Sequence, residues 1–145
     1  MSIGRICARE VDTARAEESI QAAAQRMGTR QVGTLIVVDE QHTPIGVVTD
    51  RDVAIRVVAQ GRDPHRTSVR EVMSDDVSTI PQETEVEKAL SLMRAKTVRR
   101  LPVVDGAGQL VGVVSLDDIL TQLAREFREL GQLLSEETPD SLRRG

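Results

Sequence analysis

The sequence predicts a mixed α/β (α+β) fold in which one β-α-β-β-α unit is built twice and a helical extension follows. Three observations lead to this prediction. The chain repeats itself, the apolar spacing changes between helical and strand periods inside each copy, and a long apolar series follows the second copy. The expected division is a first repeat over 2–62, a second repeat over 68–122, and a C-terminal helix with a flexible tail over 123–145.

The duplication becomes visible when the sequence is shifted over itself by 66 positions. Residues 2–53 then align with 68–119 without a gap, and 15 of the 52 pairs are identical. A unit of roughly 50 residues buries too little apolar surface to be stable by itself. We therefore expect the two copies to pack sheet against sheet with pseudo-twofold symmetry. Such a pair leaves clefts between its halves, where a ligand site is expected.

The elements of each unit follow from its apolar spacing. A short extended piece comes first, at 11–13 and at 77–79. Apolar residues at i, i+3, i+4 and i+7 then predict a helix with one apolar face, as in Val86, Ala89, Leu90 and Met93. Thr84 and Glu87 have the spacing of a capping box at its start. Two Val-rich runs predict paired strands, at 35–38 with 45–48 and at 101–104 with 110–114. A second helix begins near residue 50 or 116.

A longer helix is predicted after the second unit. Apolar residues there advance in steps of four and three: Leu116, Leu120, Leu123, Phe127, Leu130 and Leu134. This spacing indicates a helix with one apolar seam. We expect its first half to pack on its own repeat and the rest to fold back over the module or to contact a second subunit, with a homodimer contact favoured. The polar segment from Ser135, which contains Pro139, is expected to be frayed.

Composition excludes several classes of function. The net charge is −4 and Phe127 is the single aromatic residue, so neither a basic face nor stacking platforms for nucleic acid are present. No apolar stretch has the length of a signal peptide or a membrane span, which predicts a cytoplasmic protein. Cys7 lies in an apolar rhythm and is expected to be buried. His42 and His65 have no ligand-spaced neighbours, so no metal site is predicted.

A hydroxyl and a carboxylate recur where each second strand enters its helix. Thr49 is followed three residues later by Asp52, and Ser115 is followed by Asp118. Free amides at a helix start favour an anion such as phosphate, and a carboxylate one turn later can accept two hydrogen bonds from a ribose diol. The same spacing is also that of a helix cap that needs no ligand. Duplication does not decide between these two interpretations.

The paired units resemble the CBS-domain family, whose tandem pairs are called Bateman modules. The resemblance covers residues 2 to about 120 and depends on the repeated Val-Val-Asp turn and on the Gly-Val-Val-[Ser/Thr]-x-x-Asp junction. It implies a stand-alone regulatory pair that binds AMP, ADP, ATP, S-adenosylmethionine or a similar adenosyl ligand. It also implies disc-shaped dimers. No other cofactor is required, since the ligand itself is the regulatory signal.

The resemblance also implies the residues of the site. Thr49 and Ser115 would face ribose or phosphate, and Asp52 and Asp118 would hold the ribose hydroxyls. Basic residues just before the predicted strand at 101–104 would meet phosphate. The alternative for these residues is a solvated edge or a salt bridge with a nearby acid. The base would lie near the opening segment under aliphatic side chains. These further residues are Arg99, Arg100, Asp12, Ser78, Val47 and Val113.

Catalysis is not expected, because no nucleophile with a base, metal cluster or pair of carboxylates with separate roles is recognisable. The chain carries no recognisable catalytic or transport domain, so the expected effector is a separate protein. The alternative function is a ligand-free scaffold for dimerisation or protein interaction, in which the clefts bind nothing.

Overall fold

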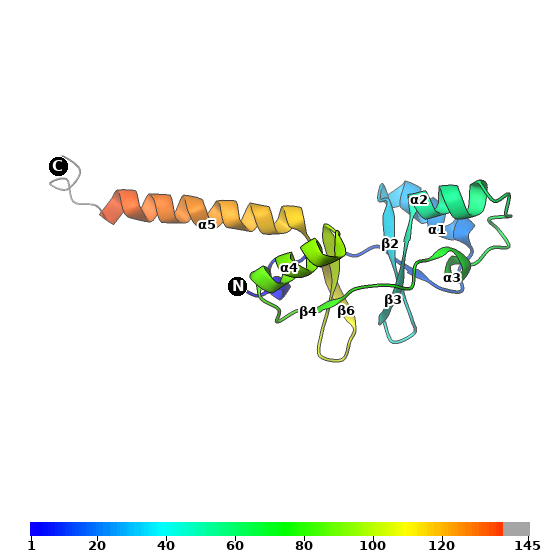
Figure 1. Ribbon diagram of the computed structural model, residues 1–145, viewed down its shortest axis with the longest axis horizontal. Coiled ribbons are helices and arrows are strands. Elements are labelled where there is room, and N and C mark those ends of the chain that lie inside the picture. The colour runs from blue at the N-terminus through cyan, green and yellow to red at the C-terminus, as the bar shows by residue number, and fades with distance from the viewer. Residues whose placement is uncertain (138–145) are drawn as a thin grey trace.

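The computed structural model describes residues 1–137 and has two similar halves, from one of which a long helix extends (Figure 1). A single 3₁₀ turn, Ile3–Arg5, opens the chain. The remaining elements are β1 (Thr13–Arg15), α1 (Ile20–Arg30), β2 (Thr34–Val38), β3 (Pro44–Thr49), α2 (Asp50–Val53) with a π-helical continuation (Ala54–Val58), α3 (Val69–Val72), β4 (Ile80–Pro81), α4 (Val86–Lys96), β5 (Arg100–Val104), β6 (Leu110–Ser115) and α5 (Leu116–Glu137).

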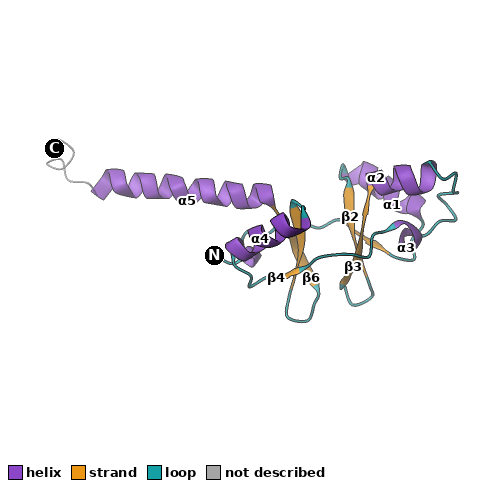
Figure 2. Ribbon diagram, viewed as in Figure 1, coloured by secondary structure: helices purple, strands orange, loops and turns teal. Residues whose placement is uncertain are grey.

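Each half contains one three-stranded sheet, in the order β1-β2-β3 or β4-β5-β6. The first strand of each sheet is parallel to the second, and the second is antiparallel to the third. The two registers are equivalent, since Val37 pairs with Gly46 and Val103 pairs with Gly112. The predicted duplication and α+β class are therefore confirmed (Figure 2). The opening strands begin two to three residues later than predicted.

Helices α1 and α4, which occupy equivalent positions in the two repeats, begin differently. The side chain of Ser19 caps α1 by accepting a hydrogen bond from the Ala22 N–H at 3.1 Å. The capping box predicted for Thr84 and Glu87 is wrong, because α4 begins at Val86 and its N-cap is Glu85, which makes no side-chain cap. Thr84 lies one residue too early for that role.

The first segment of each repeat packs into the opposite half. Ile3 is buried in the core of the second half, and Val69 and Val72 are buried in the core of the first. The backbone contacts are equivalent as well. The Ile3 N–H donates to the Thr84 carbonyl at 2.8 Å, and the Val69 N–H donates to the Glu18 carbonyl at 2.8 Å. The two repeats thus exchange segments, and each core is completed by the other repeat.

Two glycines make room for these exchanged segments. Backbone hydrogen bonds join Ala8 to β6 and Ser74 to β3. A Cβ atom at Gly112 would lie 2.6 Å from the Ala8 carbonyl oxygen, and one at Gly46 would lie 2.9 Å from the Ser74 carbonyl oxygen. Because these distances are shorter than van der Waals contact, the glycine of each Gly-Val-Val motif is required by the crossing backbone.

The outer faces of the two sheets meet in a third apolar cluster. Ile36, Val38 and Leu110 are buried there, and Val47 and Val113 pack against them. Burial alternates along β3 and β6, so Val48 and Val114 point into the helix-covered cores while Val47 and Val113 point toward the opposite half. The expected packing of sheet against sheet is therefore observed.

Only the first turns of α5 are covered by the module. Ile119 is buried there, and Leu116 and Leu123 pack around the same core, whereas Phe127 is 73% exposed. The helix continues away from both halves (Figure 1). The expected fraying from Ser135 is wrong up to Glu137, because α5 runs to that residue. The flexible tail expected over 138–145 lies outside the described residues.

Two smaller expectations concern Cys7 and the membrane. Cys7 is buried in the core of the second half, as predicted. Within residues 1–137, no helix combines the length and the apolar character needed to cross a bilayer.

We predict that Gly112→Ala lowers the free energy of unfolding by about 1–3 kcal/mol, because the added methyl group must displace the Ala8 backbone or the strand itself. Urea denaturation followed by circular dichroism measures this change. Gly106→Ala is the matched control, since no atom lies within 4 Å of a Cβ at that turn position. Equal stability of the two variants would contradict the proposed role of the glycine.

Candidate functional site

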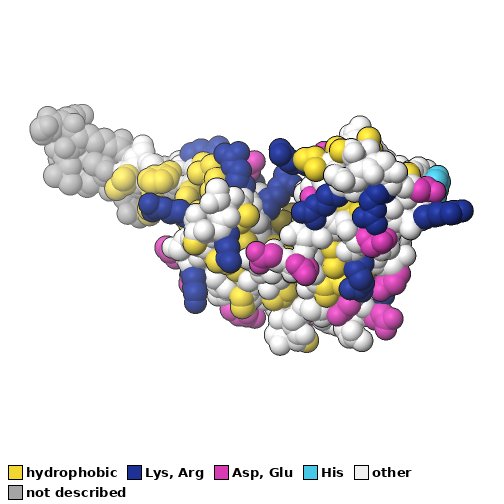
Figure 3. Space-filling model, turned by 45° about the vertical axis from the view of Figure 1, so that its right-hand side comes forward, with side chains coloured by type: hydrophobic (Ala, Val, Ile, Leu, Met, Phe, Trp, Pro, Cys, Tyr) yellow, Lys and Arg dark blue, Asp and Glu magenta, His cyan; other side chains and the backbone are white. Residues whose placement is uncertain are grey.

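A cleft of about 510 Å³ lies between the two halves. This volume falls within the roughly 300–1,000 Å³ typical of small-molecule sites. Figure 3 shows the hollow between the halves with basic and acidic side chains around its rim. Seven of the residues predicted from sequence line it: Asp12, Val47, Ser78, Arg100, Val113, Ser115 and Asp118. Thr49, Asp52 and Arg99 are not among the lining residues.

The strand-to-helix junctions are closed by capping boxes in both halves. The Asp52 N–H donates to Thr49 Oγ1 at 3.1 Å, and the Thr49 N–H donates to Asp52 Oδ2 at 2.9 Å. Ser115 and Asp118 make the same two hydrogen bonds, both at 3.0 Å. The capping interpretation of this motif is therefore correct. It leaves one carboxylate oxygen of each aspartate outside the box.

The second junction opens onto the cleft. Ser115 ends β6 and Asp118 lies in the first turn of α5, and both line the hollow. Their side chains are half-buried. In the described part of the chain, no group donates a hydrogen bond to Asp118 Oδ1 or forms an ion pair with it. This oxygen is accordingly available to a donor in the cleft.

Two cationic side chains lie on the same side of the cleft. Arg100 begins β5 and pairs with Ser115 in the sheet, which brings its side chain to the lining. Lys96, the last residue of α4, also lines the cleft. Sequence reasoning missed Lys96, although its equivalent 66 positions earlier is Arg30, a cation at the end of the equivalent helix. The predicted residue Arg99 does not line the cleft. Its backbone carbonyl accepts a hydrogen bond from the Leu116 N–H at 2.8 Å.

The opening segments differ in charge. Asp12 lines the cleft, but its Oδ1 accepts a 2.7 Å hydrogen bond from Arg30 Nε. This hydrogen bond, together with the charge of Asp12, raises the pKa of Arg30. The equivalent residue in the second half is the neutral Ser78. The rim also carries Glu10 and Asp76, a second equivalent pair that was missed from sequence.

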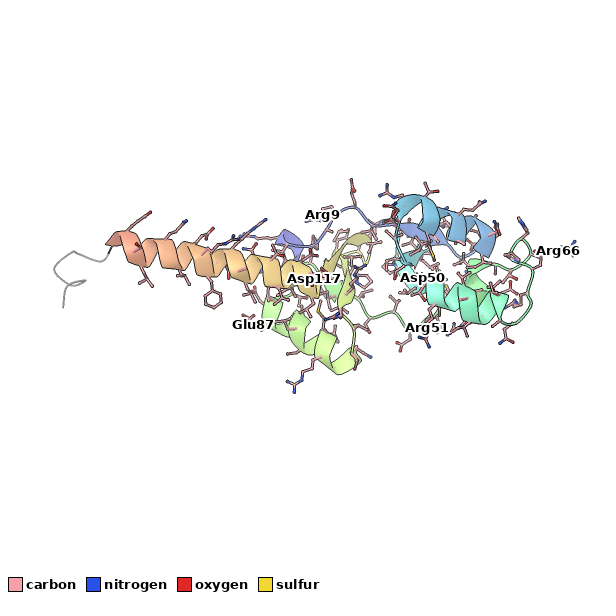
Figure 4. The ribbon with its side chains drawn as sticks, turned by 90° about the horizontal axis from the view of Figure 1, so that it is seen from above. Arg9, Asp50, Arg51, Arg66, Glu87 and Asp117 are labelled. Atoms are coloured by element: carbon pink, nitrogen blue, oxygen red, sulfur yellow. The ribbon has the colours of Figure 1, made fainter. Side chains whose placement is uncertain are left out.

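The walls of the cleft are aliphatic. Val47 and Val113 extend from the cluster between the sheets into the lining, and Ile36 and Pro102 add apolar surface beside them. These positions can cover the faces of a planar ring. Seen from above in Figure 4, Asp50 at the start of α2 and Asp117 at the start of α5 lie on the facing sides of the two halves.

A metal centre finds no support in residues 1–137. They contain no group of three or more His, Cys, Asp or Glu side chains arranged to hold an ion.

The chain belongs to the CBS-domain family. The family profile for the CBS domain matches it twice, at residues 3–59 and 69–125. It is 42% identical over 118 residues to the CBS domain-containing protein YhcV of Bacillus subtilis, with 81% of this chain and 82% of that protein covered. It is 39% identical over 120 residues to the uncharacterized protein MK0525 of Methanopyrus kandleri, covering 83% of this chain but only 61% of that relative's length.

The fold also matches a solved CBS pair. The CBS domain pair of protein MJ0100, in complex with 5′-methylthioadenosine and S-adenosyl-L-methionine, aligns with a TM-score of 0.71 at 25% identity. The alignment covers 87% of this chain and 98% of that one. The resemblance inferred from the repeated motifs is thereby confirmed at the level of family and fold.

Proposed function

We propose that this CBS pair is a regulatory module that binds an adenosyl nucleotide in the cleft between its halves and passes the bound state to a separate partner protein. The observation that carries this proposal is the grouping of Asp118, Ser115, Arg100 and Lys96 around one aliphatic cleft. The adenosyl ligands of the MJ0100 pair support the same ligand class. The proposed role requires no catalysis.

Each part of the ligand has a suitable counterpart. Asp118 Oδ1 can accept hydrogen bonds from the ribose hydroxyls, as acidic residues do in other nucleotide sites. Arg100 and Lys96 can neutralise phosphate, with Ser115 as an additional donor. Val47 and Val113 can cover the base, and the Ser78 segment can contact its edge. Burial of the apolar ring and charge pairing at the phosphate would act together.

The second candidate function is a ligand-free scaffold for dimerisation or protein interaction. It is favoured by one observation, that both hydroxyl–carboxylate pairs are already engaged with each other as helix caps. A ligand screen separates the two functions, because a scaffold gains no stability from nucleotides.

We further propose that the chain is a homodimer and that α5 supplies a contact. The distal part of this helix exposes Phe127 and Leu130. Glu126 and Arg128 flank Phe127 on opposite sides, because successive residues are about 100° apart around a helix. A parallel twofold pair would bring Arg128 of one copy toward Glu126 of the other, whereas an antiparallel pair would face like charges. The charge pattern therefore fits a second copy of this chain.

We predict that an adenosyl ligand raises the midpoint of thermal unfolding. At 100 times its dissociation constant, a ligand that binds only the native state stabilises it by about 2.7 kcal/mol. Differential scanning fluorimetry with AMP, ADP, ATP, S-adenosylmethionine, 5′-methylthioadenosine and NADH measures the shift. A folded sample that responds to none of them would favour the scaffold.

Asp118→Asn is expected to raise the dissociation constant of the responding nucleotide about tenfold or more, because an amide replaces the charged acceptor for the ribose diol. Asparagine can still accept the Ser115 N–H, so the helix cap and the stability should be nearly preserved. Isothermal titration calorimetry measures the affinity, with Glu129→Gln on the exposed face of α5 as the control. Unchanged affinity would exclude Asp118 from the site.

Phe127→Glu is expected to shift the chain from dimer to monomer, because pairing would bury an unpaired charge at the centre of the seam. Sedimentation velocity across a concentration series measures the change. Glu129→Gln, which leaves the seam intact, should remain dimeric. A variant with wild-type association would remove α5 from the interface.

A further inference from the structure

The two junctions carry the same motif in different electrostatic settings. Each aspartate uses Oδ2 in its capping box. The difference concerns the other oxygen. Oδ1 of Asp52 lies 3.8 Å from Nε of Arg56, whereas Oδ1 of Asp118 has no such cation among the described residues. Asp52 is thus engaged on both oxygens, and Asp118 on one.

Arg56 is held beside Asp52 from a second side. Its Nη1 donates a 2.8 Å hydrogen bond to the carbonyl of Val72, the last residue of α3. The positions equivalent to Arg56 and Val72 are Gln122 and Ile6. Both of these line a separate hollow of about 130 Å³ at the base of α5. In the second half, a hollow therefore adjoins the two residues that replace Arg56 and its backbone acceptor.

The same contrast recurs at the opening segments. Arg30 and Lys96 occupy equivalent positions, and Arg30 is paired with Asp12 at 2.7 Å. Ser78 replaces Asp12 in the second half, so that within residues 1–137 no carboxylate pairs with Lys96. Arg100, whose equivalent is Thr34, has no carboxylate partner in this range either. At the first end of the cleft, the lining residue Asp12 is therefore paired with a cation, and Asp52 does not reach the lining. The second end presents Lys96 and Arg100, and each end carries one rim carboxylate, Glu10 or Asp76.

We infer that the cleft binds one anionic adenosyl ligand, at the Ser115–Asp118 end, and that Arg56 and Arg30 prevent an equivalent site in the first half by engaging Asp52 and Asp12. This inference rests on the proposed function, because it assumes that such a ligand binds. It adds that the duplicated module has one working site and that Arg56 is the residue that sets this number. Arg56 acts here as a positioning residue, since it would contact no ligand.

The test is isothermal titration of the full chain with AMP. The wild-type chain should bind one AMP per chain. Gln122→Arg places an arginine at the position equivalent to Arg56 in the second half. By that equivalence, we expect the new guanidinium to reach Asp118 and the Ile6 carbonyl. We expect it to raise the dissociation constant about tenfold or more, the effect of withdrawing one charged hydrogen-bond acceptor. Gln122→Met, of similar length and without charge, should bind AMP as the wild type does.

The converse change opens the first end. The double variant Asp12→Ser, Arg56→Gln carries the second half's residues at these two positions and releases Arg30. We expect a second and weaker AMP to bind, so that the stoichiometry approaches two per chain. Arg66→Gln, which removes an exposed pair with Asp63 elsewhere in the first half, should leave the stoichiometry at one. Circular dichroism checks that each variant is folded.

The outcomes separate this inference from the proposed function. If the wild type binds no AMP, and none of the other ligands in the thermal screen, the proposed function fails and this inference fails with it. If the wild type binds two AMP per chain with equal affinity, the proposed function stands and the inference is overturned. A Gln122→Arg variant with wild-type affinity, or a folded double variant that still binds one AMP, also overturns it.

Discussion

The exchange of segments between the two repeats is the constraint on which the rest of the structure depends. Ile3 and Val69 each complete the core of the opposite half, and the backbone behind them crosses β6 or β3 at a glycine. This crossing fixes the position of one sheet relative to the other. Because the cleft lies between the sheets, its width is set by the same contacts. A small duplicated chain thereby obtains a ligand-sized hollow without a large core in either half.

Sequence reasoning predicted the fold because the repeat and the change of apolar period are local properties of the chain. It could not predict the exchange, since the apolar rhythm around Ile3 shows that the segment is buried but not in which core. The capping box at Thr84 failed for a related reason, because the helix start was uncertain by one residue. The pairing of Asp12 with Arg30 was not foreseen, as it depends on how β1 and α1 lie together. Lys96 was missed because neither it nor its equivalent Arg30 belongs to the repeated motifs that predicted the site.

The junction motif shows that a structural role and a binding role need not compete. The capping box uses one oxygen of each aspartate and leaves the other, so a single side chain can start a helix and still face a cleft. What distinguishes the two halves is the neighbourhood of the second oxygen, where Arg56 stands in the first half and Gln122 in the second. Duplication supplied two equal frameworks, and a few charged substitutions made them unequal.

The mutual completion of the cores also constrains how the molecule is made. While the chain leaves the ribosome, the first repeat stays open until Val72 has emerged, since its core includes a residue of the second repeat. Ile3 in turn waits for partners such as Leu101 and Val114, synthesised about a hundred residues later. The first half is therefore expected to fold only after Val72 has emerged, and the second half only after Ile119 has emerged. For the same reason, a protease cut between α2 and α3 would leave two fragments that stay associated through the shared cores.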